Sequence, residues 1–69
     1  MKISARNVLT GVVKSVTPGI VNAEVVLELP SGQEIVSVVT KSSVERLGIT
    51  VGKPVSAIIK SSDVLLGVD

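Results

Sequence analysis

The chain has 69 residues, a formal net charge of +1 and an apolar fraction of 45%, with no Phe, Tyr, Trp, His or Cys. This length predicts one domain, residues 1–69, and the composition excludes disulfides, zinc ligation by Cys or His, and the commonest catalytic bases and nucleophiles. The weak charge and the missing aromatic rings also argue against a nucleic-acid partner. Because so small a core is hard to stabilise alone, we expect a homo-oligomer.

The beginning of the chain carries no pattern typical of export or membrane insertion. Met1 and Lys2 are followed closely by the polar residues Ser4, Arg6 and Asn7 instead of an apolar stretch. No apolar run approaches the ~20 residues that a membrane span needs. We therefore expect a cytoplasmic protein without a membrane partner.

Turn signals divide the first half of the chain into three expected strands. The β-branched residues that dominate the composition favour strands, and Pro-Gly and Pro-Ser-Gly sequences separate them. In the second strand, Ala23, Val25 and Leu27 alternate with polar residues, as in a half-buried strand. The expected strands are residues 3 or 8 to 16, residues 21–29 and residues 34–40.

The second half predicts a short helix and two further strands. Ser42 and Glu45 have the spacing of a capping box, Val44 and Leu47 share a helix face, and Gly48 stands where a C-cap belongs. The expected strands are residues 55–60 and 64–68. This order predicts an all-β fold, a small five-stranded OB-like Greek-key barrel with one short helix.

Some apolar side chains fall on faces that should be exposed in a monomer. They belong to neighbouring expected strands, which favours a subunit interface, although scattered surface hydrophobes are normal. The residues concerned are Val26, Val36, Val38 and Ile58.

Three polar clusters supply hydrogen-bond donors without competing carboxylates. They are residues 4–7 with Ser4 and Arg6, residues 40–43 with Thr40 and Ser43, and residues 60–62 with Lys60 and Ser61. Taken singly, each is most simply a solvated loop. Together, their two cations and several hydroxyls would suit a tetrahedral dianion that carries no proton, such as molybdate, tungstate or sulfate. No cluster has the ligands of a metal-cation site, and we expect no enzyme activity.

The same clusters resemble the molbindin, or Mop, family. The opening Ser-Ala-Arg-Asn-Val-Leu-Thr-Gly of residues 4–11 is similar to the family's S-A-R-N-x-L-x-G. Glu24-Val25, residues 39–48 and residues 59–64, which contain Lys-Ser-Ser-Asp-Val, also match in order and spacing. The resemblance covers the whole chain.

The resemblance implies an OB-like barrel that assembles as a homohexamer, a trimer of dimers with strands shared between subunits. It implies molybdate or tungstate bound at subunit interfaces and a role in intracellular storage or homeostasis of these oxyanions. By the family pattern, the main site draws on Ser4, Ala5, Arg6, Lys60 and Ser61, completed by Thr40 and Ser43 from another subunit. A second site near a three-fold axis would use the backbone of Gly19, Ile20, Val21 and Asn22.

Two other functions stay open at this point. One is a nucleic-acid-binding OB module, against which the missing aromatic residues count. The other is an assembly domain whose anion site is degenerate. The sequence does not distinguish molybdate from tungstate, because the two ions share charge and shape.

Overall fold

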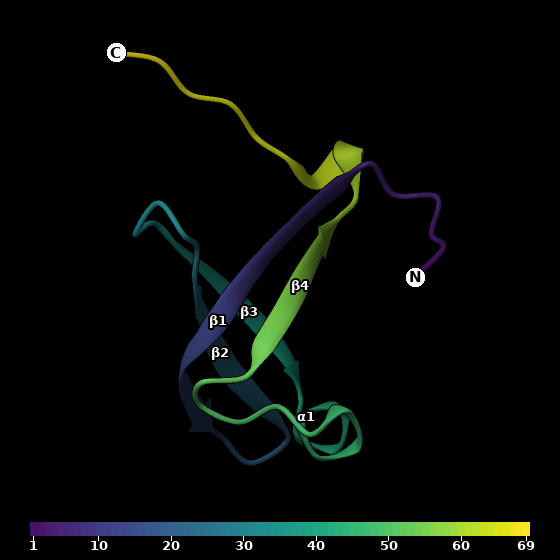
Figure 1. Ribbon diagram of the computed structural model, residues 1–69, viewed down its shortest axis with the longest axis vertical. Coiled ribbons are helices and arrows are strands. Elements are labelled where there is room, and N and C mark those ends of the chain that lie inside the picture. Colours follow the sequence, from purple (N-terminus) through teal and green to yellow (C-terminus); the bar gives the residue numbers. More distant parts are fainter.

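The computed structural model describes all 69 residues, as an antiparallel sheet with one short helix. The strand order in the sheet is β3-β2-β1-β4, so β3 and β4 form its edges. Figure 1 shows α1 at one end of the curled sheet and η1 at the other. The elements are β1 (Asn7–Pro18), β2 (Asn22–Glu28), β3 (Glu34–Thr40), α1 (Lys41–Leu47), β4 (Pro54–Ile59) and the 3-10 turn η1 (Ser61–Asp63). The first four expected strands are therefore confirmed, with their ends shifted by a few residues.

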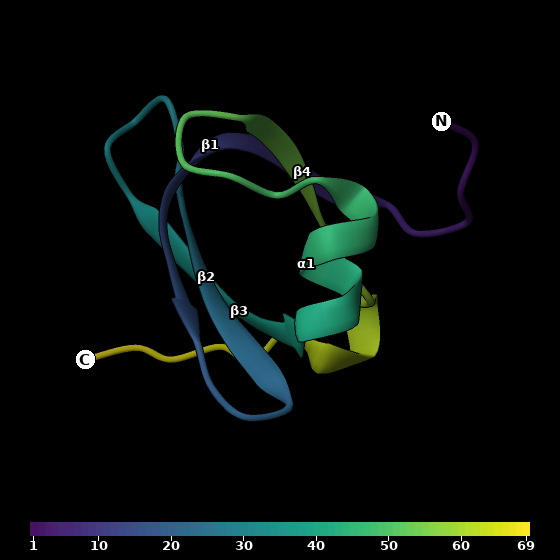
Figure 2. The same ribbon diagram turned by 90° about the horizontal axis from the view of Figure 1, so that it is seen from below.

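The core lies on the concave side of the curled sheet, where the alternation of β2 places its apolar residues. Ala23, Val25 and Leu27 of β2 are buried as predicted, and Val13 of β1 is buried beside them. Val44 of α1 packs against this cluster, which explains why the helix lies over the sheet as Figure 2 shows. Leu47, expected on the same helix face, is 58% exposed.

The long strand β1 pairs with β4 through residues 7–12 and with β2 through residues 12–18. Its register with β2 shifts between Val13 and Ser15, a bulge that leaves Lys14 facing outward, where it pairs with Glu34. The hydrogen bond to that carboxylate raises the pKa of Lys14 above its ordinary value. Close packing between β1 and β2 also requires Gly11, since a Cβ there would lie 2.7 Å from the carbonyl oxygen of Glu28.

The helix begins two residues earlier than the capping box predicted. Thr40, not Ser42, is the N-cap, and its Oγ1 accepts a hydrogen bond from the backbone N–H of Ser43 at 3.1 Å. The expected reciprocal bond between Ser42 and Glu45 is absent, because β3 runs directly into the helix and its last residue already supplies the cap. The C-cap at Gly48 is confirmed, with φ +64°.

The expected fifth strand is not formed within this chain. Residues 64–69 leave the sheet after η1 and run free of it, away from both sheet edges in Figure 1. Leu65 and Leu66 are 91% and 94% exposed. A strand exists only through hydrogen bonds to a neighbour, and the chain offers this segment none. The sheet thus has four strands and stays open between β3 and β4.

No helix of the structure has both the length and the apolar character needed to cross a membrane.

Candidate functional site

An open pocket of about 560 Å³ lies where β1 begins and β4 ends. In the antiparallel register of these strands, Asn7 pairs with Ile59. Arg6 comes directly before this last pair and Lys60 directly after it, so the two cations lie at the same end of the sheet although they are distant in sequence. The pocket is lined by Ser4, Ala5, Arg6, Ile58, Lys60, Ser61 and Ser62. Five of the seven residues predicted for the main oxyanion site therefore lie together.

The charges of this pocket have one sign. Its two charged lining residues, Arg6 and Lys60, are both cations, and like charges held close together repel unless an anion lies between them. The chain's one ion pair joins Lys14 to Glu34, so neither Arg6 nor Lys60 has a carboxylate partner. No carboxylate is among the lining residues. The pocket can therefore offer a guanidinium, an ammonium and hydroxyls to an anion.

The hydroxyl of Ser61 has a partner just outside the lining. Asn7, the first residue of β1, donates from Nδ2 to the Oγ of Ser61 at 3.4 Å. Ser62 also lines the pocket but was not among the predicted site residues. The sequence could have indicated Ser62 as a site residue, because it follows Lys60 and Ser61 in the same polar cluster.

Thr40 and Ser43 do not reach this pocket within one chain. They lie where β3 meets α1, at the opposite end of the sheet from η1 (Figure 1). The Oγ1 of Thr40 donates to the Oγ of Ser43 at 2.7 Å, in addition to capping the helix. Any share that these two residues have in the site must come from another copy, as the resemblance implied.

The residues of the expected second site form the turn between β1 and β2. The N–H of Gly19 donates to the carbonyl oxygen of Asn22 at 2.7 Å, and the carbonyl of Val21 accepts from the N–H of Lys41 at 2.9 Å. The side chain of Ile20 is 96% exposed. This turn is far from the pocket, at the other end of β1.

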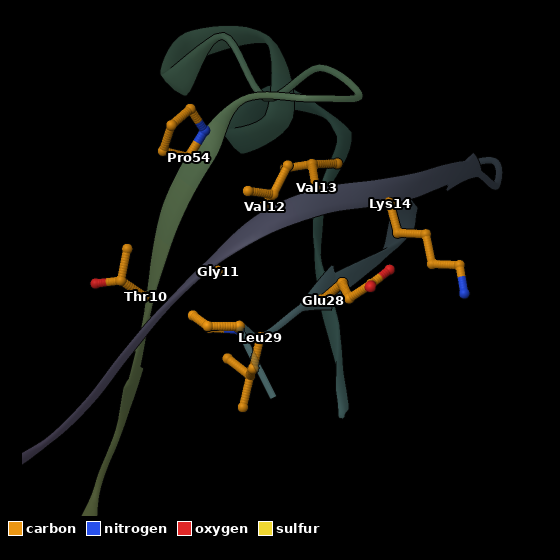
Figure 3. A pocket seen from close by; sticks show the side chains of 9 residues that line it. Thr10, Gly11, Val12, Val13, Lys14, Glu28, Leu29 and Pro54 are labelled. Carbon is orange, nitrogen blue, oxygen red and sulfur yellow. The ribbon is translucent and has the colours of Figure 1, made fainter. Parts of the chain in front are cut away.

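A second pocket lies on β1 near the β2–β3 turn, and Figure 3 shows it from close by. Gly11 lies at its middle, Leu29 and Pro54 add apolar surface, and Lys14 and Glu28 lie at one end. Because it contains a carboxylate and mostly apolar groups, it suits a dianion less well than the pocket at Arg6 and Lys60.

Comparisons with known proteins agree with this architecture. Residues 3–66 match the family model described as the TOBE domain. Molybdenum-pterin-binding protein 1 of Clostridium pasteurianum is 47% identical over 66 residues, which cover 96% of this chain and 97% of that protein.

Solved structures share the fold closely. A molybdate-binding protein from Sporomusa ovata superposes with a TM-score of 0.90 at 36% identity, over 96% of this chain and 97% of that one. ModG, described as a cytoplasmic molybdate-binding protein and solved with molybdate bound, gives a TM-score of 0.96 at 54% identity. The match covers all of this chain and 49% of ModG.

The chain therefore belongs to the TOBE domain family, within its molbindin, or Mop, branch. The resemblance drawn from residues 4–11 and 59–64 is confirmed. These relatives are named for binding and not for catalysis.

Proposed function

We propose that this protein binds molybdate or tungstate as an unprotonated tetrahedral dianion in the pocket at Arg6 and Lys60. The observation that carries the proposal is the pairing of these two cations, together with Ser4 and Ser61, in a pocket without a carboxylate. The two positive charges match a dianion, and charge-assisted hydrogen bonds are stronger than neutral ones. Relatives of almost the same length are named for molybdenum or molybdate binding.

The complete site requires a second copy of the chain. Thr40 and Ser43 of a neighbouring subunit would add hydroxyls to the pocket, while residues 64–68 would form the missing fifth strand of an OB-like barrel. The exposed Val36 and Val38 of β3 supply apolar surface for such contacts, at 59% and 64% exposure. We propose a homohexamer built as a trimer of dimers, with a second backbone site at Gly19–Asn22 near its three-fold axis.

The proposed role is storage and homeostasis of these oxyanions in the cytoplasm. The description of ModG as cytoplasmic supports the location. A site that holds the ion through cations and hydroxyls, without a cluster of metal-ligating side chains, supports reversible binding and release.

Isothermal titration calorimetry tests the proposal. Molybdate and tungstate titrated into the protein in buffer free of sulfate and phosphate should bind with similar affinities, because their charge and shape agree. Absence of heat and of saturable binding for both ions would contradict the proposal and favour a pure assembly domain.

A further inference from the structure

The pocket at Arg6 and Lys60 lies where both ends of the chain leave the sheet. Residues 4–6 precede β1, and η1 is followed by residues 64–69, as Figure 1 shows. No backbone hydrogen bond reaches residues 4–6. The one side-chain bond across this end of the sheet joins Asn7 to Ser61, at 3.4 Å. The two walls of the pocket are therefore weakly joined in the free chain.

An anion reverses the electrostatic interaction between these two walls. Arg6 belongs to one wall and Lys60 to the other, and neither has a carboxylate partner. Without an anion the two cations repel each other, whereas a dianion between them attracts both. Binding of the dianion therefore draws the segment before β1 and the segment after β4 together.

The 3-10 turn η1 connects the pocket directly to the end of the chain. The N–H of Asp63 donates to the carbonyl oxygen of Lys60 at 2.9 Å, and the N–H of Val64 donates to the carbonyl oxygen of Ser61 at 3.4 Å. Lys60 and Ser61 both line the pocket, so the first residue after η1 is bonded to a pocket residue. An anion that fixes η1 thereby fixes the direction in which residues 65–69 leave it.

We infer that oxyanion binding is coupled through η1 to the docking of residues 64–69 on a second copy of the chain, so that each strengthens the other. The inference rests on the proposed function of the pocket and adds its regulation by assembly. The end of the chain is the segment to dock, because Leu65 and Leu66 are almost fully exposed while the edges β3 and β4 remain unpaired.

Coupling between two binding events is reciprocal, so two measurements on the full chain should agree. Calorimetry gives the molybdate affinity of wild type and of the double variant Leu65→Ser, Leu66→Ser. Sedimentation gives the protein concentration at which the wild-type assembly half dissociates, with and without molybdate. We expect the double variant to bind molybdate at least about 5-fold more weakly, and molybdate to lower the dissociation concentration by a similar factor per subunit. Val51→Ser, an exposed apolar residue outside this segment, is the control and should change neither.

Substitution of Val64 separates coupling through η1 from the loss of a neighbouring subunit's hydroxyls. Val64→Gly loosens the backbone between η1 and Leu65, whereas Val64→Ala removes most of the same side chain and keeps the backbone restricted. We expect molybdate to stabilise the assembly roughly 2- to 5-fold less in Val64→Gly than in Val64→Ala, the size of such a backbone effect. Equal effects of molybdate on the two variants would overturn the route through η1.

Hydrogen exchange in wild type provides a measurement that needs no variant to fold. Molybdate should slow the exchange of backbone amides from Ser61 through Leu66, and protection that ended at Asp63 would overturn the coupling. If wild type bound molybdate while its affinity stayed the same in the Leu65→Ser, Leu66→Ser variant, the coupling would fall and the proposed function would stand. Absence of molybdate binding in wild type would remove both.

Discussion

At the scale of single residues, the candidate site residues stand out in the sequence, whereas the contacts that position them do not. Arg6 and Lys60 stand out as cations among hydroxyls, and the structure places both in one pocket. Asn7 belongs to the same opening cluster, yet its contact with Ser61 depends on the register of β1 with β4. That register is a tertiary property, since it pairs residues more than fifty positions apart. Local patterns do not encode it.

Substitution of Arg6 tests the charge of the pocket. Arg6→Ala should weaken molybdate binding by about 1.5–3 kcal/mol, because it removes a charge-assisted hydrogen bond. Titration calorimetry measures the loss. Arg46→Ala is the matched control, since Arg46 lies in the last turn of α1, outside the pocket, and should leave the affinity unchanged. Equal affinities for wild type and Arg6→Ala would remove Arg6 from the site.

At the scale of elements, alternation and turn residues locate four strands, but one-dimensional patterns misplace the start of the helix. Ser42 and Glu45 have the spacing of a capping box. Thr40 performs the capping instead, since the hydrogen bonds of β3 with β2 continue up to the pair Thr40 and Asn22 and fix where the chain turns. The pairing with β2 thus decides between two plausible caps.

Removal of the cap distinguishes these two assignments. Thr40→Ala should lower the free energy of unfolding by about 1 kcal/mol, because the N–H of Ser43 loses its acceptor. Chemical denaturation in the absence of molybdate measures this change. Ser42→Ala serves as the control and should be close to neutral; a larger loss in Ser42→Ala than in Thr40→Ala would restore the cap predicted from the sequence.

At the scale of the whole molecule, the fifth strand shows where prediction from one chain ends. Residues 64–68 are apolar and follow the polar interruption of residues 61–63, which is why the sequence predicts a strand there. Within the chain they find no partner, and Leu65, Leu66 and Val68 are among the most exposed apolar side chains. The same holds for Thr40 and Ser43, which lie far from the pocket they were predicted to complete. A sequence pattern predicts a strand or a binding residue, but it does not show whether the partner lies in the same subunit or in another one.

A charge on the exposed face of β3 tests whether that face is an interface. Val38→Asp should reduce the molecular mass in solution, because an aspartate buried between subunits would lose its hydration without a partner. Light scattering coupled to size-exclusion chromatography measures the mass. Thr50→Asp, in the exposed loop before β4, is the matched control and should keep the mass of wild type. An unchanged mass in Val38→Asp would place the interface elsewhere.

The most direct test of the account is anomalous diffraction at the molybdenum edge from crystals grown with molybdate. We expect a molybdenum peak whose oxyanion lies within hydrogen-bond distance of Arg6, Lys60 and Ser61 of one subunit, with a neighbouring subunit closing the site. Molybdenum bound only at other places, with Arg6 and Lys60 left facing solvent in every subunit, would contradict it.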